Sequence, residues 1–256
     1  MSHKLYVVGL GPGNEGAMTA DAAEALEDSE VLVGYSVYIN LIPPERLRSG
    51  EIYSSGMGTE VERCRYALDQ AAEGRTTALV CGGDPGVYGM ASLIYGLTAS
   101  SGDGPEGMKE EKYRQVDIII IPGVTAALSG AAVLGAPVGN DFAVISLSTA
   151  LTPWEVIEAR LAAAAKADFV IVLYNPASRS RQDTLRRACD IISEHTGRDR
   201  IAGYVRNAGR KGEEYAVTTV GEIGDMQLDM FCTVFIGSSA TEVINGKMIT
   251  GRKYRL

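Results

Sequence analysis

The residues with the clearest capacity for chemistry lie in a glycine-rich segment, 81–90, in which four glycines surround Asp84-Pro85. Glycine lets the backbone bend sharply and lets a ligand approach it closely. Proline keeps the residue before it out of the helical region, so Asp84-Pro85 fixes a turn. A strand-like run, 76–80, precedes the segment, so we expect a loop at the carboxyl end of a strand, where parallel sheets hold small molecules. The alternative is a tight strand-to-helix turn without a ligand.

The polar groups of this segment suit a nucleoside that carries an amino acid. The Asp84 carboxylate can accept hydrogen bonds from a ribose or pair with an ammonium group. Backbone groups at Gly82 and Gly83 can bond a carboxylate or an amine. Alternatively, Asp84 only closes an Asx turn, in which the side chain bonds its own backbone two residues further on.

A second glycine cluster, Gly-Leu-Gly-Pro-Gly at 9–13, ends the first strand-like run. A dinucleotide-binding fingerprint, G-x-G-x-x-G, can be placed on Gly11, Gly13 and Gly16. The match is weak, because Pro12 lacks an N–H that a phosphate site would use. The second strand-like run is also not followed by the acid that binds a ribose. A nicotinamide or flavin site therefore ranks below another ligand.

A third strand-like run ends in Pro122-Gly123, and small residues after it open a helix. The small side chain of Ala126 would let a flat ring lie against the backbone. Thr125 can serve as the cap of this helix, which is its alternative role if it contacts no ligand.

Polar residues also follow two strand-like runs in the second half of the chain, at Tyr174-Asn175 and at Arg206-Asn207-Ala208. A local basic cluster in this acidic protein consists of Arg179, Arg181, Arg206, Arg210 and Lys211. Because the guanidinium fork is well suited to carboxylates, we interpret the cluster as a site for an acidic ligand. The alternative is a set of solvated surface side chains.

The elements that must position these segments alternate between strand and helix. In the first half we expect strands near 5–9, 31–33, 76–81 and 117–121, and helices near 19–26, 60–72 and 91–97. This alternation predicts an α/β fold with a parallel sheet and helices on both faces. The run 116–121 is almost continuously β-branched and predicts a strand buried on both sides. The polar segment 100–107 is interpreted as an exposed loop.

The motif at 137–141 marks the expected junction, which divides the chain into domains 1–136 and 137–256. In the second domain we expect strands near 142–147, 169–174, 201–205, 215–219 and 233–236, and helices near 154–165 and 182–194. Its later strands follow one another with little helix between them, which favours a mixed sheet. Thr152, Pro153 and Glu155 predict a capping box at the start of the 154–165 helix.

Composition excludes several function classes. The chain has 256 residues, 46% of them hydrophobic, and a net charge of −8, so a general affinity for nucleic acid is not expected. It has no apolar run of membrane-spanning length and no signal-peptide pattern. Four dispersed cysteines without a C-x-x-C pair indicate buried, reduced thiols in a cytoplasmic protein. Only His3 and His195 are present, so a His-rich metal site is excluded and no metal is expected.

Taken in order, these motifs resemble the tetrapyrrole (corrin/porphyrin) methylase family. The general resemblance rests on Gly9-Leu10-Gly11-Pro12-Gly13, on Gly82-Gly83-Asp84-Pro85 and on Pro-Gly-Val-Thr-Ala-Ala at 122–127. The segments 34–38, 84–89, 151–155, 173–179 and 205–210 are similar to the branch that methylates precorrin-3B at C17, with ring contraction, in cobalamin biosynthesis. The resemblance implies two α/β lobes of the class III methyltransferase kind, a homodimer, and S-adenosylmethionine in a cleft between the lobes.

The resemblance also implies roles for individual residues. The cofactor would be surrounded by Pro12, Gly82, Gly83, Asp84, Val87, Thr125, Ala126, Tyr174, Asn175, Asn207 and Ala208. The substrate would contact Gly11, Gly13, Arg179, Arg206, Arg210 and Lys211, the basic side chains meeting its acetate and propionate arms. Tyr35, Ser36 and Tyr88 are the candidates for proton transfer during ring contraction. The sequence departs from the family at Tyr35 and at 148–150, where related sequences carry Asp, and this leaves the acid–base group unassigned.

Three alternatives stay open. The first is a methyltransferase of the same fold that acts on another precorrin position or on a modified protein residue. The second is an NAD-dependent oxidoreductase, and the third is a non-catalytic nucleotide-binding module. The sequence also leaves open whether the tetrapyrrole already contains cobalt.

Overall fold

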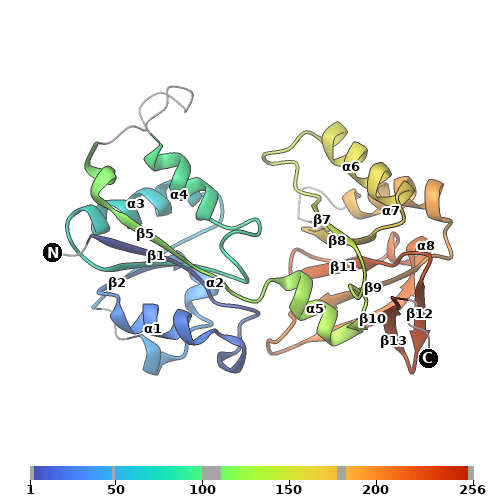
Figure 1. Cartoon of the computed structure of the whole chain (residues 1–256), viewed down its shortest axis with the longest axis horizontal. Coiled ribbons are helices and arrows are strands. Elements are labelled where there is room, and N and C mark those ends of the chain that lie inside the picture. The colour runs from blue at the N-terminus through green and yellow to red at the C-terminus, as the bar shows by residue number, and fades with distance from the viewer. Residues whose placement is uncertain (1–2, 48–49, 100–110, 178–182, 253–256) are drawn as a thin grey trace. The chain divides into compact units, whose positions relative to one another are not determined.

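The structure is a computed structural model that describes residues 3–47, 50–99, 111–177 and 183–252. The loop expected at 100–107, and Arg179 and Arg181, lie outside the described residues. The chain divides into two units, Met1–Thr125 and Ala126–Leu256 (Figure 1). The division precedes the helix at 126–134, whereas the sequence led us to expect the junction after it. Ala127, Ala131 and Leu134 of that helix belong to a hydrophobic cluster of the second unit, which explains the difference.

In the first unit, five parallel strands form a sheet in the order β3-β2-β4-β1-β5. The strands are β1 (Lys4–Gly9), β2 (Val31–Tyr35), β3 (Glu51–Ser55), β4 (Thr77–Cys81) and β5 (Asp117–Ile121). The helices are α1 (Ala20–Asp28), α2 (Ser36–Ile39), α3 (Glu60–Ala72) and α4 (Ala91–Thr98), with 3-10 turns at Glu15–Ala17, Pro44–Arg46 and Glu111–Gln115. The predicted parallel α/β architecture is therefore confirmed.

Helices cover both faces of this sheet because side chains alternate along each strand. Leu5 and Val7 of β1 belong to a cluster with Leu68 of α3, whereas Val8 packs with Leu26 of α1 in a second cluster. Figure 1 shows α1 on one face and α3 and α4 on the other. The carboxyl ends of all five strands thus meet at one edge of the sheet, which positions the loops that follow them.

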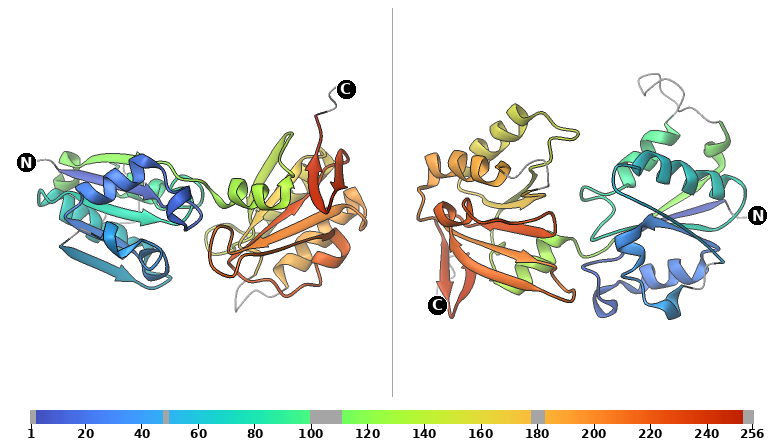
Figure 2. Two further views of the ribbon diagram at one scale, coloured as in Figure 1. Left: turned by 90° about the horizontal axis from the view of Figure 1, so that it is seen from below. Right: turned by 180° about the vertical axis from the view of Figure 1, so that it is seen from behind.

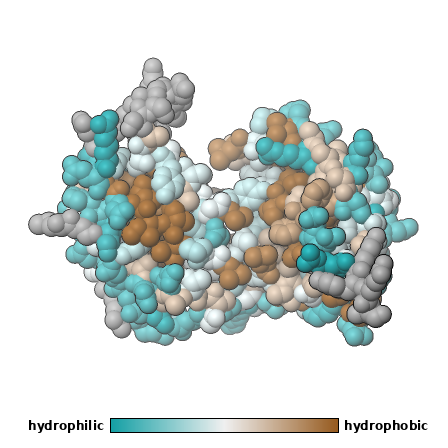
Figure 3. Space-filling model, in the orientation of Figure 1, coloured by the Kyte–Doolittle hydropathy of each residue, from teal (hydrophilic) through white to brown (hydrophobic). Residues whose placement is uncertain are grey.

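The expectation that 116–121 forms a strand buried on both sides is wrong. β5 pairs only with β1 and lies at the edge of the sheet, so its four isoleucines are half-buried. Figure 3 shows the hydrophobic surface that results over this strand. Composition predicted the strand correctly, but it cannot distinguish a central strand from a hydrophobic edge strand. β3, at the opposite edge, was not predicted, because its sequence is short and largely exposed.

The second unit contains a five-stranded mixed sheet and a small three-stranded sheet (Figure 2). The first has the order β10-β9-β11-β8-β7, in which only β7 and β8 are parallel neighbours. The strands are β6 (Gly135–Ala136), β7 (Phe142–Ser146), β8 (Val170–Tyr174), β9 (Ile201–Arg206), β10 (Glu214–Thr219), β11 (Cys232–Ile236), β12 (Thr241–Ile244) and β13 (Lys247–Thr250). The helices are α5 (Ala126–Leu134), α6 (Trp154–Lys166), α7 (Thr184–Thr196) and α8 (Val220–Ile223). The mixed sheet confirms the prediction.

One predicted feature of α6 is wrong. Pro153, not Thr152, is the residue that flanks the helix, and it makes no side-chain cap bond. Glu155 is consequently the second residue of the helix and cannot complete a capping box. Each helix in the described part of the chain is too short or too polar to cross a membrane.

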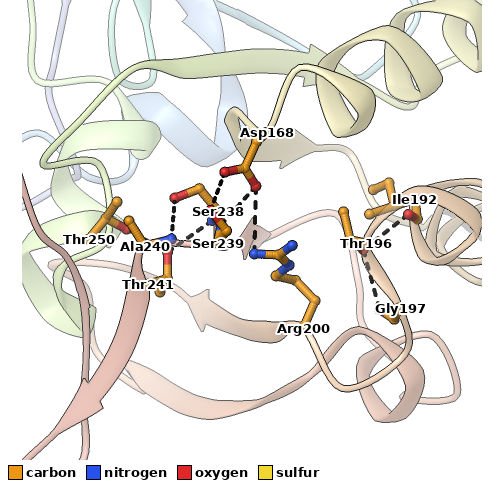
Figure 4. Close-up of polar contacts among 10 residues, drawn as sticks. All are labelled: Asp168, Ile192, Thr196, Gly197, Arg200, Ser238, Ser239, Ala240, Thr241 and Thr250. Atoms are coloured by element: carbon orange, nitrogen blue, oxygen red, sulfur yellow. Dashed lines mark hydrogen bonds and ion pairs between the residues drawn. The ribbon is translucent and has the colours of Figure 1, made fainter.

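A polar cluster joins the amino ends of β8 and β9 to the turn between β11 and β12 (Figure 4). The Asp168 carboxylate accepts hydrogen bonds from the backbone N–H and the hydroxyl of Ser239, and it lies 3.6 Å from Nη1 of Arg200. Nearby, Thr241 Oγ1 accepts from Ser238 N at 2.9 Å. These contacts lie at the sheet edge opposite the ends of β8 and β9 that carry Asn175 and Asn207, so we interpret them as structural.

Candidate functional site

Three glycine-rich loops meet at the carboxyl edge of the first sheet. They follow β1, β4 and β5, which are neighbours in the order β4-β1-β5. Gly11 and Gly83 form an isolated bridge, with N to O distances of 3.1 and 2.9 Å. Both residues have positive φ, near 68° and 67°, which glycine adopts without strain. The first two loops are therefore joined through their backbones.

The third loop approaches the others so closely that no side chain would fit. A Cβ at Gly123 would lie 2.2 Å from the carbonyl oxygen of Gly83, and one at Gly9 would lie 2.7 Å from the same atom. At Gly82, a Cβ would lie 2.5 Å from the ring of Tyr38. Gly9 and Gly123 are thus required by packing between the loops and Gly82 by packing against α2, independently of any ligand.

Asp84 links two of the loops through its carboxylate. Oδ1 accepts a hydrogen bond from Gly86 N at 2.7 Å, which is the Asx turn, and Oδ2 accepts one from Gly123 N at 3.0 Å. A carboxylate offers about four lone-pair directions, so each oxygen can accept one further bond. The side chain is partly exposed. Asp84 can therefore hold the loops together and still bind a ribose hydroxyl or an ammonium group.

Two of the three candidate acid–base residues follow β2, the other neighbour of β4. Tyr35 ends β2 and Ser36 begins α2, and the Tyr35 ring packs edge-on against Tyr38 at 5.3 Å. Tyr88 lies in the loop after β4 with φ of 54° and is 53% exposed. All three residues therefore lie at the same sheet edge as the glycine loops, and their roles in proton transfer stay predictions.

Arg63 also lies at this edge, although it was not predicted as a site residue from the sequence. The centre of its guanidinium group is 5.8 Å from the centroid of the Tyr35 ring. Arg63 precedes Cys64 on the buried face of α3, four residues before Ala67. An arginine in phase with the apolar positions of an amphipathic helix was the signal that could have identified it.

The local structure after β1 argues against a dinucleotide site. After Gly13 the chain makes a 3-10 turn at Glu15–Ala17, and α1 begins only at Ala20. The N-cap of α1 is Thr19, whose Oγ1 accepts from Ala22 N at 3.2 Å. A dinucleotide site would need the helix to begin within the glycine loop, where its N-terminus could bind the pyrophosphate. The local geometry does not have that form.

In the second unit, polar residues gather at the carboxyl ends of β7, β8 and β9. β8 and β9 run in the same direction, because β11 lies antiparallel to both. Asn175 and Asn207, which follow them, have left-handed φ values of 54° and 51°. Asn175 Nδ2 donates to Ser146 Oγ at 3.0 Å, while the Tyr174 hydroxyl accepts from Ala127 N in the first turn of α5 at 2.7 Å. Tyr174 thus satisfies a backbone N–H that the helix itself leaves unpaired.

The basic cluster of the second unit is of mixed charge. Nη2 of Arg206 lies 2.7 Å from Asp229, and its Nη1 lies 3.6 Å from Glu214. Gly209 N, one residue before Arg210, donates to Glu213 at 2.7 Å. Lys211 is exposed. Because Arg206 already has two carboxylate partners, we expect it to contribute less to substrate binding than the sequence suggested. The proposed contacts of Arg206, Arg210 and Lys211 with a substrate stay predictions.

The cysteines are buried free thiols, as predicted. Burial raises the pKa of Cys81 to about 11, and the pKa values of Cys64, Cys189 and Cys232 to about 12. None of them is therefore a thiolate nucleophile near neutral pH. Within the described ranges, no cluster of His, Cys, Asp and Glu side chains could hold a metal ion.

Several known proteins are similar to this chain over nearly its whole length. The model of the Tetrapyrrole (Corrin/Porphyrin) Methylases matches residues 4–224. A probable cobalt-factor III C(17)-methyltransferase of Salmonella typhimurium is 41% identical over 98% of this chain and all of its own length. A precorrin-3B C(17)-methyltransferase of Sinorhizobium sp is 39% identical over 95% of this chain and 92% of its own. The crystal structure of the methyltransferase CobJ matches with a TM-score of 0.85 and 34% identity, covering 96% of this chain and 99% of that one. The chain therefore belongs to the tetrapyrrole (corrin/porphyrin) methylase family.

Proposed function

We propose that this protein transfers a methyl group from S-adenosylmethionine to C17 of precorrin-3B, or of its cobalt form, with contraction of the macrocycle in cobalamin biosynthesis. The observation that carries the proposal is similarity over nearly the whole chain to two relatives that are both named for C17 methylation. One of them is named for a cobalt-containing substrate and the other is not, so both forms are included.

The loops of the first unit fit the proposed cofactor. Asp84 keeps acceptor capacity after bonding Gly86 and Gly123, and it would bind the ribose hydroxyls or the ammonium group. Bound S-adenosylmethionine supplies an electrophilic methyl group, which the substrate carbon takes with its own electron pair. The residues Pro12, Gly82, Gly83, Val87, Thr125, Ala126, Tyr174, Asn175, Asn207 and Ala208 are proposed as further cofactor contacts.

The contribution of the protein to methyl transfer would be mainly positional. The substrate carbon is already electron-rich, so no strong protein nucleophile is needed. Holding reactants in line can lower a barrier by roughly 7–11 kcal/mol. Rigid loops suit this role, because the Gly11–Gly83 bridge and the two Asp84 bonds fix them before any ligand arrives. Tyr35, Ser36 and Tyr88 are proposed to donate or accept the proton during ring contraction.

The decisive experiment is incubation of the protein with S-adenosylmethionine and either precorrin-3B or its cobalt form, followed by mass spectrometry. We expect a product with one added methyl group from at least one of them, and a ring position assigned to C17 by NMR. Methylation at another position would favour the same-fold alternative. In parallel, S-adenosylhomocysteine but not NADH should raise the melting temperature, because only a ligand that binds the folded state stabilises it.

We further propose that the protein is a cytoplasmic homodimer. The family resemblance motivates the dimer, and four buried free thiols are consistent with a reducing compartment. Sedimentation equilibrium should give twice the chain mass of 27.2 kDa. A monomer at all concentrations would contradict the dimer without affecting the proposed reaction.

A further inference from the structure

A buried arginine lies at the carboxyl edge of the first sheet. Arg63, on α3, is 4% exposed and shares its helix face with Cys64 and Ala67, which are fully buried. Arginine is almost never buried to this degree unless it is paired, because removing a charge from water is costly.

Both partners in the structure are neutral. Nε donates to Ser55 Oγ at 3.0 Å, and Nη2 donates to the backbone oxygen of Gly56 at 2.8 Å. Among the described residues, no carboxylate lies within ion-pair distance of Arg63, although Arg46, Arg75, Arg186 and Arg206 each have at least one such partner. The positive charge of this guanidinium group is thus held in place without being neutralised.

One side of the group stays available. Nη1 of Arg63 has no acceptor among the described residues. Among those residues, Arg206 Nε is the side-chain nitrogen or oxygen atom that is both fully buried and without a partner. Nη1 is therefore not fully enclosed. It can donate two hydrogen bonds to a group that approaches from outside.

The position of Arg63 relates it to the candidate site. Ser55 ends β3, and Tyr35, whose ring faces the guanidinium group at 5.8 Å, ends β2. β2 lies between β3 and β4, and the Gly82–Gly83 loop follows β4. Arg63 therefore lies at the same edge as the glycine loops, on the side away from β1 and β5.

We propose that Arg63 anchors an anion subsite, at which Nη1 donates hydrogen bonds to a carboxylate of a bound ligand. The inference deepens the proposed function and rests on it. Two ligand groups there have this chemistry, namely an acetate or propionate arm of the tetrapyrrole and the carboxylate of the methionine moiety of the cofactor. The bonds to Ser55 and Gly56 hold the guanidinium fork before binding, so little side-chain freedom is lost when the carboxylate arrives.

The test compares Arg63→Met with Arg65→Met, a matched control two residues along the same helix. Arg65 is exposed, so both variants lose one positive charge from α3 but only one loses the buried group. Uroporphyrin III, a stable tetrapyrrole with acetate and propionate arms, would serve as one probe by fluorescence titration. S-adenosylhomocysteine would serve as the other by calorimetry. Melting temperatures of all variants would be recorded.

We expect Arg63→Met to weaken binding of one probe by about tenfold to a hundredfold, as for lost hydrogen bonds between charged groups, and Arg65→Met to change it less than about twofold. A loss confined to uroporphyrin assigns the subsite to a substrate arm, and a loss confined to S-adenosylhomocysteine assigns it to the cofactor. Unchanged affinity for both probes in a folded Arg63→Met protein overturns the proposal. A lower melting temperature with unchanged affinities also overturns it, because Arg63 would then only support the fold.

If Arg63→Met does not fold, Arg63→Lys replaces it, because lysine keeps the charge but not the fork. We expect a loss of about threefold to tenfold in the affected affinity, and an unchanged affinity overturns the proposal. The two proposals can fail separately. A wild-type protein that binds a probe through Arg63 but does not methylate precorrin-3B contradicts the proposed function and leaves the subsite intact.

Discussion

The carboxyl edges of the two large sheets carry polar loops built in different ways. At the edge of the first sheet, backbone contacts dominate, since Gly9, Gly83 and Gly123 touch one another and Asp84 bonds two loop N–H groups. At the edge of the second sheet, side chains dominate. Asn175, which has a left-handed backbone conformation, donates a side-chain hydrogen bond to Ser146. The Tyr174 hydroxyl accepts a hydrogen bond from a backbone N–H in the first turn of α5. We infer that the first edge tolerates almost no change of side chain, whereas the second can vary more freely.

The two edges also differ in how they hold an arginine. Arg63 is buried with two neutral partners, whereas Arg206 is 41% exposed in its side chain and has two carboxylate partners. An arginine that is already paired with carboxylates of its own chain should bind a ligand carboxylate more weakly. We therefore expect a buried arginine without a carboxylate partner to be a better sign of an anion site than a cluster of basic residues in the sequence.

The largest effect is expected for Gly123→Ala. The added Cβ would lie 2.2 Å from the Gly83 oxygen, and the contact can be relieved only by moving backbone. We expect a loss of about 3 kcal/mol in the free energy of unfolding, and a loss of S-adenosylhomocysteine binding by calorimetry. Gly96→Ala is the control, because a Cβ there meets nothing within 4 Å and alanine favours the helix. Normal stability of the Gly123→Ala protein would contradict the inference that the first edge tolerates side-chain changes less well than the second.

Asp84→Ala should have the next largest effect. It removes two hydrogen bonds from backbone N–H groups to a carboxylate, so we expect a loss of about 2–3 kcal/mol in stability and no measurable affinity for S-adenosylhomocysteine. Asp141→Ala, which removes an exposed carboxylate just before β7, should change stability by less than about 0.5 kcal/mol. Normal affinity in folded Asp84→Ala protein would exclude Asp84 from the cofactor site.

Much of this architecture follows from sequence, since strands and helices were predicted wherever apolar residues recur with a clear period. The parallel first sheet and the mixed second sheet followed from the order of those elements. The failures have physical causes. β3 is polar and exposed because it is an edge strand, and β5 has the composition of a central strand although it also lies at an edge. Strand order depends on contacts between distant segments, which local composition does not encode.

The loops of the candidate site could be predicted where their geometry depends on the backbone. Gly83 and Asp84 were singled out because glycine and Asp-Pro have few other uses at the end of a strand, and their roles in ligand binding stay predictions. Arg206 was identified from local charge, but Asp229, its partner, lies 23 positions further along the chain and was not considered. Arg63 was missed because its burial depends on the packing of α3 against the sheet.

The cysteines at the two edges allow the comparison to be sharpened by pH. Cys81 ends β4, and Cys232 begins β11 at the edge that carries Asn175; burial raises their pKa values to about 11 and about 12. An unfolded thiol has a pKa of about 8.5, so between pH 8 and 10 the unfolded state binds fewer protons and stability must fall. Each thiol should contribute about 2 kcal/mol to this fall. In urea unfolding under reducing conditions, Cys81→Ala and Cys232→Ala should each reduce the difference between pH 8 and pH 10 by that amount. A reduction for only one variant would mean that the other thiol is less enclosed than the structure indicates.

The smallest effect is expected for Arg206→Met, the counterpart of Arg63→Met at the second edge. The side chains of Arg206 and Asp229 are 41% and 39% exposed, and ion pairs this accessible to water contribute at most about 1 kcal/mol. Because both carboxylate partners already occupy the guanidinium group, uroporphyrin affinity should fall by less than about threefold, which is well below the loss for Arg63→Met. Glu214→Gln is the control, since it removes the charge of the weaker partner, 3.6 Å away, and leaves Arg206 in place.

If Arg206→Met weakened uroporphyrin binding as much as Arg63→Met, Arg206 would have to exchange its own carboxylates for those of the ligand. The distinction between a neutralised and an isolated arginine would then fail.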